Sequence, residues 1–198
     1  MHVVPMAEAE LTDDRDAAEA DVLARVGLGD PAAITKIYEQ HHRAVRAFAQ
    51  RLLGDPEAAE DLLQDVFVAL PAAIRRFRGD CALRSYLILV AVNHAKNHVR
   101  AAVRRRAAVA RLGREPIATV TTPEQELSRR DLARRLMQAL DGLPFEQRVV
   151  VVLSEIEERT SAEIGAILGV PEGTVRTRLF HAKRKLRELL GEGEGAQS

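Results

Sequence analysis

The sequence predicts an all-α protein with two small helical domains joined by a flexible linker, the C-terminal domain containing a helix-turn-helix. Aromatic residues make up only 4% of the 198 residues and Trp is absent, so the cores must be built from aliphatic side chains, as helical bundles allow. Apolar residues recur at helical spacing through most of the chain, and no two segments show the alternation expected of paired strands. Two short helical patterns around a Gly-containing turn stand near the C-terminus.

The N-terminal part is predicted to hold an acidic segment followed by two helices. The acidic segment covers residues 1–25, and we expect its early part to be disordered. A helix is expected to begin near Asp16 and to break at residues 27–30. Pro31 suits the start of the next helix, which carries an apolar stripe that includes His41.

A third helix is expected after Asp55, with acidic side chains near its start, where the helix dipole favours them. Pro71 lies where the apolar pattern would continue, so we expect a kink or an early end there. Residues 75–82 are then predicted to form a basic loop. Leu83–Arg106 is predicted to form one long helix with basic outer positions and with His94 on its inner side.

The C-terminal half begins with a stretch that lacks periodicity and is rich in Gly, Pro and Thr, so residues 107–127 are predicted to be a linker. A helix is expected over Ser128–Ala139. The segment Glu146–Ile156 contains VVVVL, which local propensity assigns to a strand. We predict a buried helix instead, because no second strand pattern exists to pair with it. Residues 191–198 are expected to form a frayed tail.

The helix-turn-helix is predicted over residues 160–190. Thr160 and Glu163 have the spacing of a capping box, and Gly169 supplies the end of the first helix. The second helix has an apolar face and an outer face with a polar and aromatic tip and a basic tail. Such a face suits a reader of the major groove, whereas the plainer interpretation is a solvated cationic face on an ordinary helix pair.

The net charge of zero results from separate acidic and basic segments. Residues 55–65 carry five acidic residues and no Lys or Arg. By contrast, residues 75–106 carry nine Lys or Arg and one acidic residue, and residues 172–187 carry six Lys or Arg and one acidic residue. We therefore expect the acidic and basic surfaces to bind different partners, with nucleic acid at the basic ones.

Taken in order, these segments resemble the extracytoplasmic-function group of bacterial RNA polymerase sigma factors. The resemblance covers roughly residues 30–190. It is carried by AAEDLLQDVF, RFRGDCALRSYLILVAVNHAKNHVR and LPFEQRVVVVLSEIEERTSAEIGAILGVPEGTVRTRLFHAKRKL. It implies a region 2 domain over residues 26–106 that binds core polymerase and the minus-10 promoter element. It also implies a region 4 domain over residues 128–190 that binds the minus-35 element.

The resemblance also implies three sets of binding residues, to which we add the neighbouring cations Arg78, Arg100 and Arg184. The sequence departs from the usual family residues at Pro71, Tyr86, Leu89 and His181. The expected polymerase-binding set is Glu60, Asp61, Gln64 and Asp65; the minus-10 set is Phe77, Arg78, Asn93, Lys96, Asn97 and Arg100; the minus-35 set is Arg176, Thr177, Phe180, His181, Lys183 and Arg184.

The expected partners are core RNA polymerase, promoter DNA and an anti-sigma factor, without membrane insertion. We expect no cofactor and no metal. His94 and His98 stand four apart on one predicted helix, but no third ligand has suitable spacing. A single Cys, Cys81, excludes an internal disulfide and fits a reducing, cytoplasmic location.

Two other classes of function remain as alternatives. A stand-alone helix-turn-helix regulator would bind an operator by itself and would need a dimerisation surface. A DNA recombinase would need a nucleophile in a mixed α/β domain, and neither a strand pattern nor a Gly-rich phosphate loop is evident. We therefore expect a sigma factor without catalysis of its own.

Overall fold

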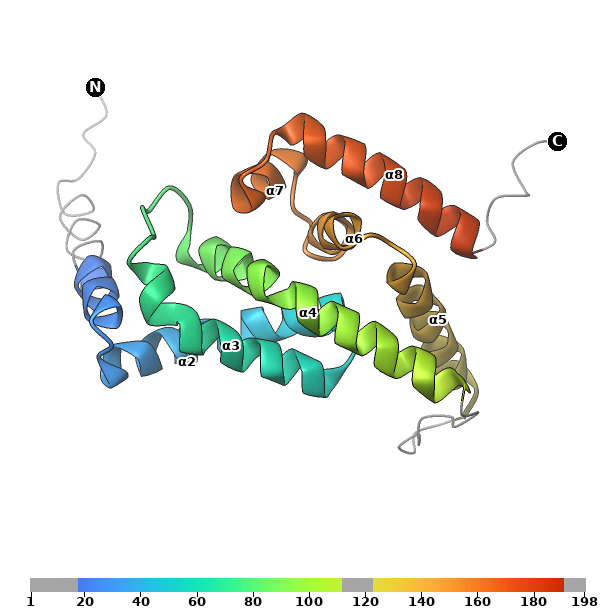
Figure 1. The fold of residues 1–198 in the computed structure, drawn as a ribbon, viewed down its shortest axis with the longest axis horizontal. Helices are drawn as coiled ribbons and strands as arrows, with labels where there is room; N and C mark the ends of the chain where they lie inside the picture. Colours follow the sequence, from blue (N-terminus) through green and yellow to red (C-terminus); the bar gives the residue numbers. More distant parts are fainter. Residues whose placement is uncertain (1–17, 112–122, 191–198) are drawn as a thin grey trace, which may run out of the picture.

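The computed structural model describes residues 18–111 and 123–190, and every regular element in these ranges is helical (Figure 1). This confirms the all-α prediction. Residues 18–27 form the first described helical segment. The elements after it are α2 (Pro31–Leu53), α3 (Pro56–Ile74), α4 (Leu83–Arg111), α5 (Pro123–Asp141), α6 (Phe145–Val151), the π-helical turn η1 (Val152–Ile156), α7 (Ser161–Leu168) and α8 (Glu172–Leu190).

Two aspartates set the starts of α2 and α3. The Asp30 carboxylate accepts a hydrogen bond of 2.9 Å from the Ala32 amide, and the Asp55 carboxylate accepts one of 3.1 Å from the Glu57 amide. These bonds satisfy amides that have no partner within the helix. Gly54 ends α2 in the left-handed region, with φ 63°.

The early end expected at Pro71 is wrong, because α3 continues through this residue to Ile74. The proline removes only one amide donor, and the last turn is held by other contacts. Leu70 and Ile74 are buried, and the Tyr86 hydroxyl donates a 2.8 Å hydrogen bond to the Ala73 carbonyl. The Arg75 side chain donates to the Pro71 carbonyl at 3.3 Å.

The helices that flank the expected linker are longer than predicted. Helix α4 ends at Arg111 rather than Arg106, and α5 begins at Pro123 rather than Ser128. The rest of that linker, the early acidic segment and the C-terminal tail lie outside the described residues. The VVVVL segment is helical, as predicted, and forms the end of α6 and the start of η1.

The helices pack in two groups that share one buried apolar core. Helices α2, α3 and α4 pack together, and α6, α7 and α8 pack together, with α5 against α8. Figure 1 shows α6 between α4 and α8. The core runs from α2, α3 and α4 into α6, η1 and α7, so the two groups are in direct apolar contact.

The surface of α4 differs from the prediction at His94. His94 was expected on the inner side but is exposed, whereas His98 is half-buried. The reason is the helical phase: Ala91, Ala95 and Val99 are the buried residues, and His98 lies beside this stripe.

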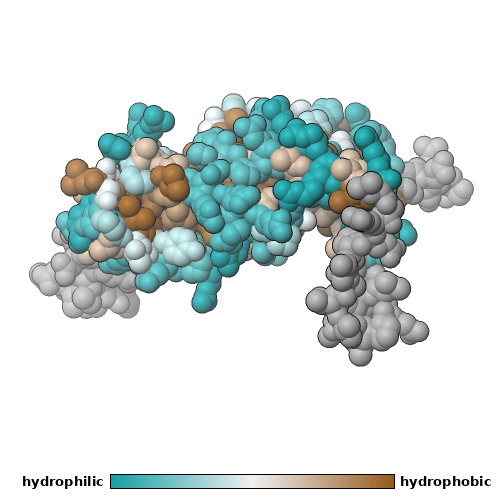
Figure 2. Space-filling model, turned by 60° about the horizontal axis from the view of Figure 1, so that its bottom comes forward, coloured by the Kyte–Doolittle hydropathy of each residue, from teal (hydrophilic) through white to brown (hydrophobic). Residues whose placement is uncertain are grey.

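Figure 2 shows the molecule turned so that the lower side of Figure 1 comes forward. The middle of this face is mainly hydrophilic, whereas apolar side chains gather toward its left end. Within residues 18–111 and 123–190, none of the helices combines the length and apolar character needed to cross a membrane.

Candidate nucleic-acid interface

Helix α7 begins with a capping box and ends at a left-handed glycine, which starts the turn to α8. The Thr160 hydroxyl accepts a 3.2 Å hydrogen bond from the Glu163 amide, and the Glu163 carboxylate accepts a 2.8 Å bond from the Thr160 amide. The bond from the Thr160 amide is the main reason why the pKa of Glu163 is lowered. Gly169 ends α7 with φ 64°.

Gly165 allows α7 and the following turn to approach closely. A Cβ atom at this position would lie 2.8 Å from the Val170 carbonyl oxygen, which is closer than real Cβ contacts. The sequence analysis did not single out Gly165. An isolated Gly inside a helical pattern is the signal that could have done so.

Helix α8 buries Val175 and Ala182 and turns its opposite face to solvent. The Phe180 side chain is 64% exposed, and its ring centroid lies 5.5 Å from that of His181 in an edge-on arrangement. An exposed aromatic ring between cations suits contact with base edges or a thymine methyl group. All six residues expected to meet the minus-35 element are exposed on this helix: Arg176, Thr177, Phe180, His181, Lys183 and Arg184.

All three Lys and Arg residues of this set have ion pairs within the C-terminal group of helices, and that of Arg184 with Glu188 of the same helix is the longest, at 4.0 Å. Arg176 pairs with Glu172, one turn earlier on α8. Lys183 lies 2.8 Å from the Glu155 carboxylate of η1, and this hydrogen bond lowers the pKa of Glu155. All three pairs are exposed, so DNA phosphates can replace the carboxylates at small energetic cost.

The residues expected to bind polymerase lie along one side of α3. Asp61 and Gln64 are exposed, Glu60 pairs with Arg46 at 3.0 Å, and Asp65 accepts a 2.7 Å hydrogen bond from His98 if that ring nitrogen is protonated. Val68 follows Asp65 by three positions and is 82% exposed, so it extends the same face. The structure therefore brings these residues together with an apolar side chain that the sequence analysis did not include.

Four of the six residues expected at the minus-10 element lie along one exposed face of α4. These are Asn93, Lys96, Asn97 and Arg100, whose spacing places them on neighbouring turns. Lys96 is not free, because its ammonium lies 3.4 Å from the Glu146 carboxylate of α6 and 5.9 Å from the centre of the Phe145 ring.

Glu146 lies in the first turn of α6 and is held as an anion. A hydrogen bond from its own backbone amide, followed by the contact with Lys96, lowers the pKa of Glu146. Sequence analysis did not find this residue, because its role depends on how the two groups of helices dock.

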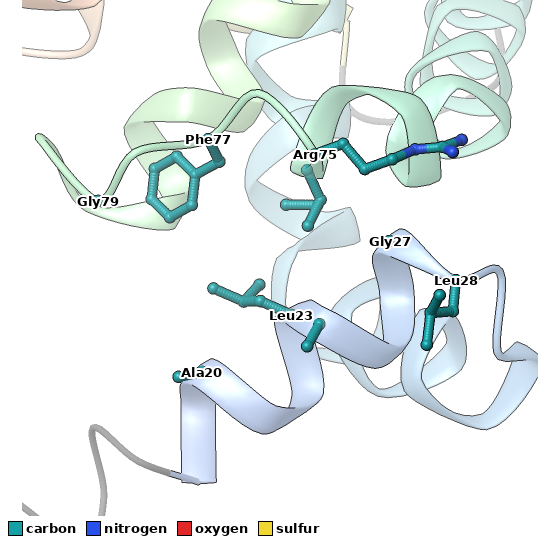
Figure 3. Close-up of a pocket in the computed structure, with 9 residues that line it drawn as sticks. Ala20, Leu23, Gly27, Leu28, Arg75, Phe77 and Gly79 are labelled. Atoms are coloured by element: carbon teal, nitrogen blue, oxygen red, sulfur yellow. The ribbon is translucent and has the colours of Figure 1, made fainter.

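The other two residues expected at the minus-10 element, Phe77 and Arg78, lie in the loop between α3 and α4, and Arg78 is exposed. The Phe77 ring is half-buried, with its centroid 4.8 Å from that of Tyr86. Phe77 also lines a groove of about 470 Å³, opposite Leu23 and Ala20 of the first helical segment (Figure 3). The groove is mainly apolar, and Leu28 at its edge is 89% exposed.

A charged cluster joins the end of α4 to α5 and α6. Arg106 donates hydrogen bonds to both oxygens of Asp141, at 2.7 and 2.6 Å, and to the Leu53 carbonyl at 2.6 Å. Arg148 is only 1% exposed and donates to Asp141 at 2.7 Å. Its other two nitrogens are buried with no hydrogen-bond partner among the described residues, and burial lowers the pKa of Arg148.

Profiles of two protein families match this chain in the order of its two helical groups. The family described as Sigma-70 region 2 matches residues 37–105, and the family described as Sigma-70, region 4 matches residues 133–186. The first match contains α3 and most of α4, and the second contains α7 and most of α8.

Curated proteins of similar sequence cover most of the chain. The RNA polymerase sigma-H factor of Pseudomonas aeruginosa is 28% identical over 91% of this chain and 96% of its own length. The ECF RNA polymerase sigma factor SigM of Mycobacterium tuberculosis is 30% identical over 88% of this chain and 85% of its own. The RNA polymerase sigma factor CarQ of Myxococcus xanthus is 33% identical over 84% of this chain and 94% of its own length.

Two solved structures of similar fold are complexes. One is the sigma factor RpoE with the anti-sigma factor NepR from Bartonella quintana, with a TM-score of 0.54, 26% identity and coverage of 81% of this chain and 98% of that chain. The other is CnrH with the cytosolic domain of CnrY, with a TM-score of 0.61 and 25% identity. The match covers 89% of this chain and 99% of that chain.

Proposed function

The chain belongs to the extracytoplasmic-function (ECF) RNA polymerase sigma factors and acts in transcription initiation, and from this premise we propose a role for each of its surfaces. Residues 26–106 form the domain that joins core polymerase and binds the minus-10 element. Residues 128–190 form the domain that binds the minus-35 element. The order of the two family matches supports this division.

The acidic side of α3 is the proposed polymerase-binding surface. Glu60, Asp61, Gln64 and Asp65 give it charge and hydrogen-bonding groups, and Val68 adds an exposed apolar contact. A charged rim around an apolar residue is a common arrangement in protein interfaces. The acidic charge also repels DNA from this side.

The proposed minus-10 surface combines the loop before α4 with the exposed face of that helix. Phe77 offers an aromatic ring beside Arg78, and Asn93, Lys96, Asn97 and Arg100 offer hydrogen bonds and positive charge. Opening a promoter requires unstacked bases to be held while cations meet the backbone of the separated strand. These residues provide both kinds of contact.

The proposed minus-35 surface is the exposed face of α8, and this face is the main observation that supports the proposed function. Arg176, Thr177, Phe180 and His181 can reach base edges, while Lys183 and Arg184 can meet phosphates. A short capped helix and a close turn before α8 hold this face in place, as in other helix-turn-helix proteins. The proposed role is regulatory and gives the chain no catalytic step.

Run-off transcription with purified core RNA polymerase and a library of promoter fragments tests this proposal. We expect specific transcripts that require both proteins, with start sites that share sequence elements about 10 and about 35 base pairs upstream. Absence of transcripts, together with specific DNA binding by the chain alone, would instead support a stand-alone helix-turn-helix regulator.

We further propose that an anti-sigma factor binds this chain in the cytoplasm, where RNA polymerase works. The solved relatives RpoE and CnrH support this, since each was solved with a partner, named as the anti-sigma factor NepR for RpoE and the cytosolic domain of CnrY for CnrH. A pull-down from the native cell is expected to recover polymerase and a dedicated small partner. Repeated recovery of polymerase alone would contradict this part of the proposal.

A further inference from the structure

Two of the four residues proposed to bind polymerase are bonded to basic side chains of neighbouring helices. Glu60 of α3 pairs with Arg46 of α2, whose Nη2 atom lies 3.0 Å from each of the two carboxylate oxygens. Asp65, further along α3, has its Oδ2 atom 2.7 Å from the Nε2 atom of His98 on α4. The two carboxylates are therefore held from two different helices.

The basic partners lie on helices that the apolar core fixes in place. Helix α3 packs against both α2 and α4. The His98 side chain is only 20% exposed and lies beside the buried residues Ala95 and Val99 of α4. The Nε atom of Arg46 is buried, with no hydrogen-bond partner among the described residues. Groups supported in this way keep a neighbouring carboxylate in a narrow range of positions.

The bond from His98 leaves Asp65 able to bind a partner. A hydrogen on Nε2 is donated to Oδ2 whether the ring is neutral or doubly protonated. The Asp65 side chain is 52% exposed, so its other oxygen remains open to a cationic or N–H group of polymerase. A side chain that is fixed before binding also avoids the entropy cost of being ordered at the interface.

The other polar residues of this surface have no such support. Asp61 and Gln64 are exposed and have no side-chain hydrogen bond or ion pair to other described residues. The surface therefore combines two fixed carboxylates with two polar side chains that are free to adjust.

We propose that Arg46 and His98 are positioning residues for polymerase binding, which hold Glu60 and Asp65 in the orientation that the enzyme meets. This inference rests on the proposed function, which assigns the acidic side of α3 to polymerase. The polymerase-binding site then depends on α2, α3 and α4 together, and His98 belongs to the same helix as the proposed minus-10 residues.

A double-mutant cycle with purified core RNA polymerase tests the role of His98. His98→Leu removes the bond to Asp65, and we expect it to weaken binding of the chain to polymerase by about twofold to tenfold. The same change in an Asp65→Ala chain should have no further effect, because the carboxylate through which it acts is absent. An equal loss in both backgrounds, or a gain in affinity, would overturn the role of His98.

Two further variants separate the hydrogen bond from other effects of losing a histidine. His98→Gln keeps an N–H donor, so it should retain more affinity than His98→Leu. His94→Leu is the matched control, one turn earlier on α4, where the histidine has no hydrogen bond or ion pair within the described ranges. Equal losses in His98→Gln and His98→Leu, or an equal loss in the control, would contradict the proposal.

Arg46 is tested in the same way. Arg46→Met should weaken polymerase binding by about twofold to tenfold, and the loss should vanish in a Glu60→Ala chain. The control is Arg43→Met, which removes the same charge from an exposed residue of α2 that has no ion pair in the described part of the chain. Equal effects of the two variants would mean that net charge, and not the bond to Glu60, is responsible.

The titration of the wild-type chain separates this inference from the proposed function. Failure of the wild type to bind core polymerase would remove the assignment of α3 and, with it, the inference. Binding by the wild type that is unchanged in His98→Leu and Arg46→Met would leave that assignment intact and remove only the positioning roles. Thermal unfolding of each variant checks that it is folded at the temperature of the titration.

Discussion

Exposed side chains on α8 carry positive charge that is available to bind DNA. Arg176 is exposed and pairs only with Glu172 on its own helix among the described residues. An exposed pair of this kind contributes little to stability. Its guanidinium therefore remains available for a guanine edge or a phosphate, and the two possibilities differ in how they depend on sequence.

Replacing Arg176 with Ala is expected to weaken binding to the minus-35 element by about 1–3 kcal/mol if this side chain reads a base. The loss should then vary with the base at one position, because a bidentate contact discriminates between bases. Binding to a set of single-base variants of the promoter measures this. A uniform loss on every sequence would assign Arg176 to the phosphate backbone.

His41 gives a prediction about pH. Burial, together with the nearby Arg84, lowers the pKa of this side chain below its ordinary value of 6.5, although Glu19 opposes the shift. The folded state therefore favours the neutral ring, and the unfolded chain takes up more protons as the pH falls. The stability that the neutral ring contributes is present above about pH 6.5 and is lost as the pH falls through the lowered pKa.

Thermal unfolding of wild type at about pH 7.5 and about pH 5.5 should therefore show a lower midpoint at the lower pH. His41→Gln removes the titrating ring and is expected to make this decrease smaller. An identical decrease in wild type and variant would show that other groups cause the pH dependence.

At the scale of the element, the helix-turn-helix depends on backbone positions as much as on side chains. Helix α7 has only eight residues, so it is too short to be stable alone and needs its caps and its packing. Thr160 and Glu163 satisfy its first amides, and Gly169 ends it. Gly165 then sets how closely α7 approaches the turn before α8.

Gly165→Ala is expected to destabilise this element by about 1–3 kcal/mol, because the new Cβ would lie 2.8 Å from a backbone carbonyl that cannot move without opening the turn. Gly173→Ala is the matched control. It is the same change in the first turn of α8, where no atom lies within 4 Å of the new Cβ.

We expect the control to leave stability unchanged or to raise it by up to about 1 kcal/mol, because Ala favours helix. Chemical denaturation of both variants measures the difference. Equal stability of the two variants would mean that the approach at Gly165 is not tight in solution.

At the scale of the whole molecule, charged groups connect the two helical groups near the end of α4. Arg106 is the central residue, since it joins the carbonyl at the end of α2 to Asp141 at the end of α5. Asp141 also neutralises the buried Arg148, so a single carboxylate faces two guanidinium groups. A carboxylate with two cationic partners is a strong local connection.

Arg106→Met is expected to raise the hydrogen exchange of α5 amides, because it removes the bonds from α4 to Asp141 and to Leu53. Hydrogen bonds to charged groups are worth about 1.5–3 kcal/mol, so an increase of at least about tenfold is expected. Arg105→Met is the control, because the ion pairs of Arg105 with Asp55 and Glu57 stay between α4 and α3. An equal increase in both variants would contradict the role of Arg106.

Much of this protein could be predicted from residue order alone, because the relevant forces act over a few residues. Helical periodicity, the capping box of Thr160 and Glu163 and the glycine stop at Gly169 are local signals, and the helix-turn-helix and the all-α class were predicted from them. The motif residues on α3, α4 and α8 are exposed together on their helices because helical spacing sets which residues share a face.

Other features were decided by tertiary contacts. The helix passes through Pro71 because buried neighbours and Tyr86 compensate for one missing amide bond, which the sequence pattern cannot show. His94 is exposed and His98 half-buried because α4 takes its rotation from the apolar core.

The partners of Lys96 and Arg106, Glu146 and Asp141, are 50 and 35 positions away in the sequence. Pairs of this kind depend on how helices dock, and docking is determined by the shape and area of the apolar surfaces rather than by any local signal. The sequence alone therefore determined which helices form and which residues they expose, whereas the tertiary structure decided which of those residues are covered.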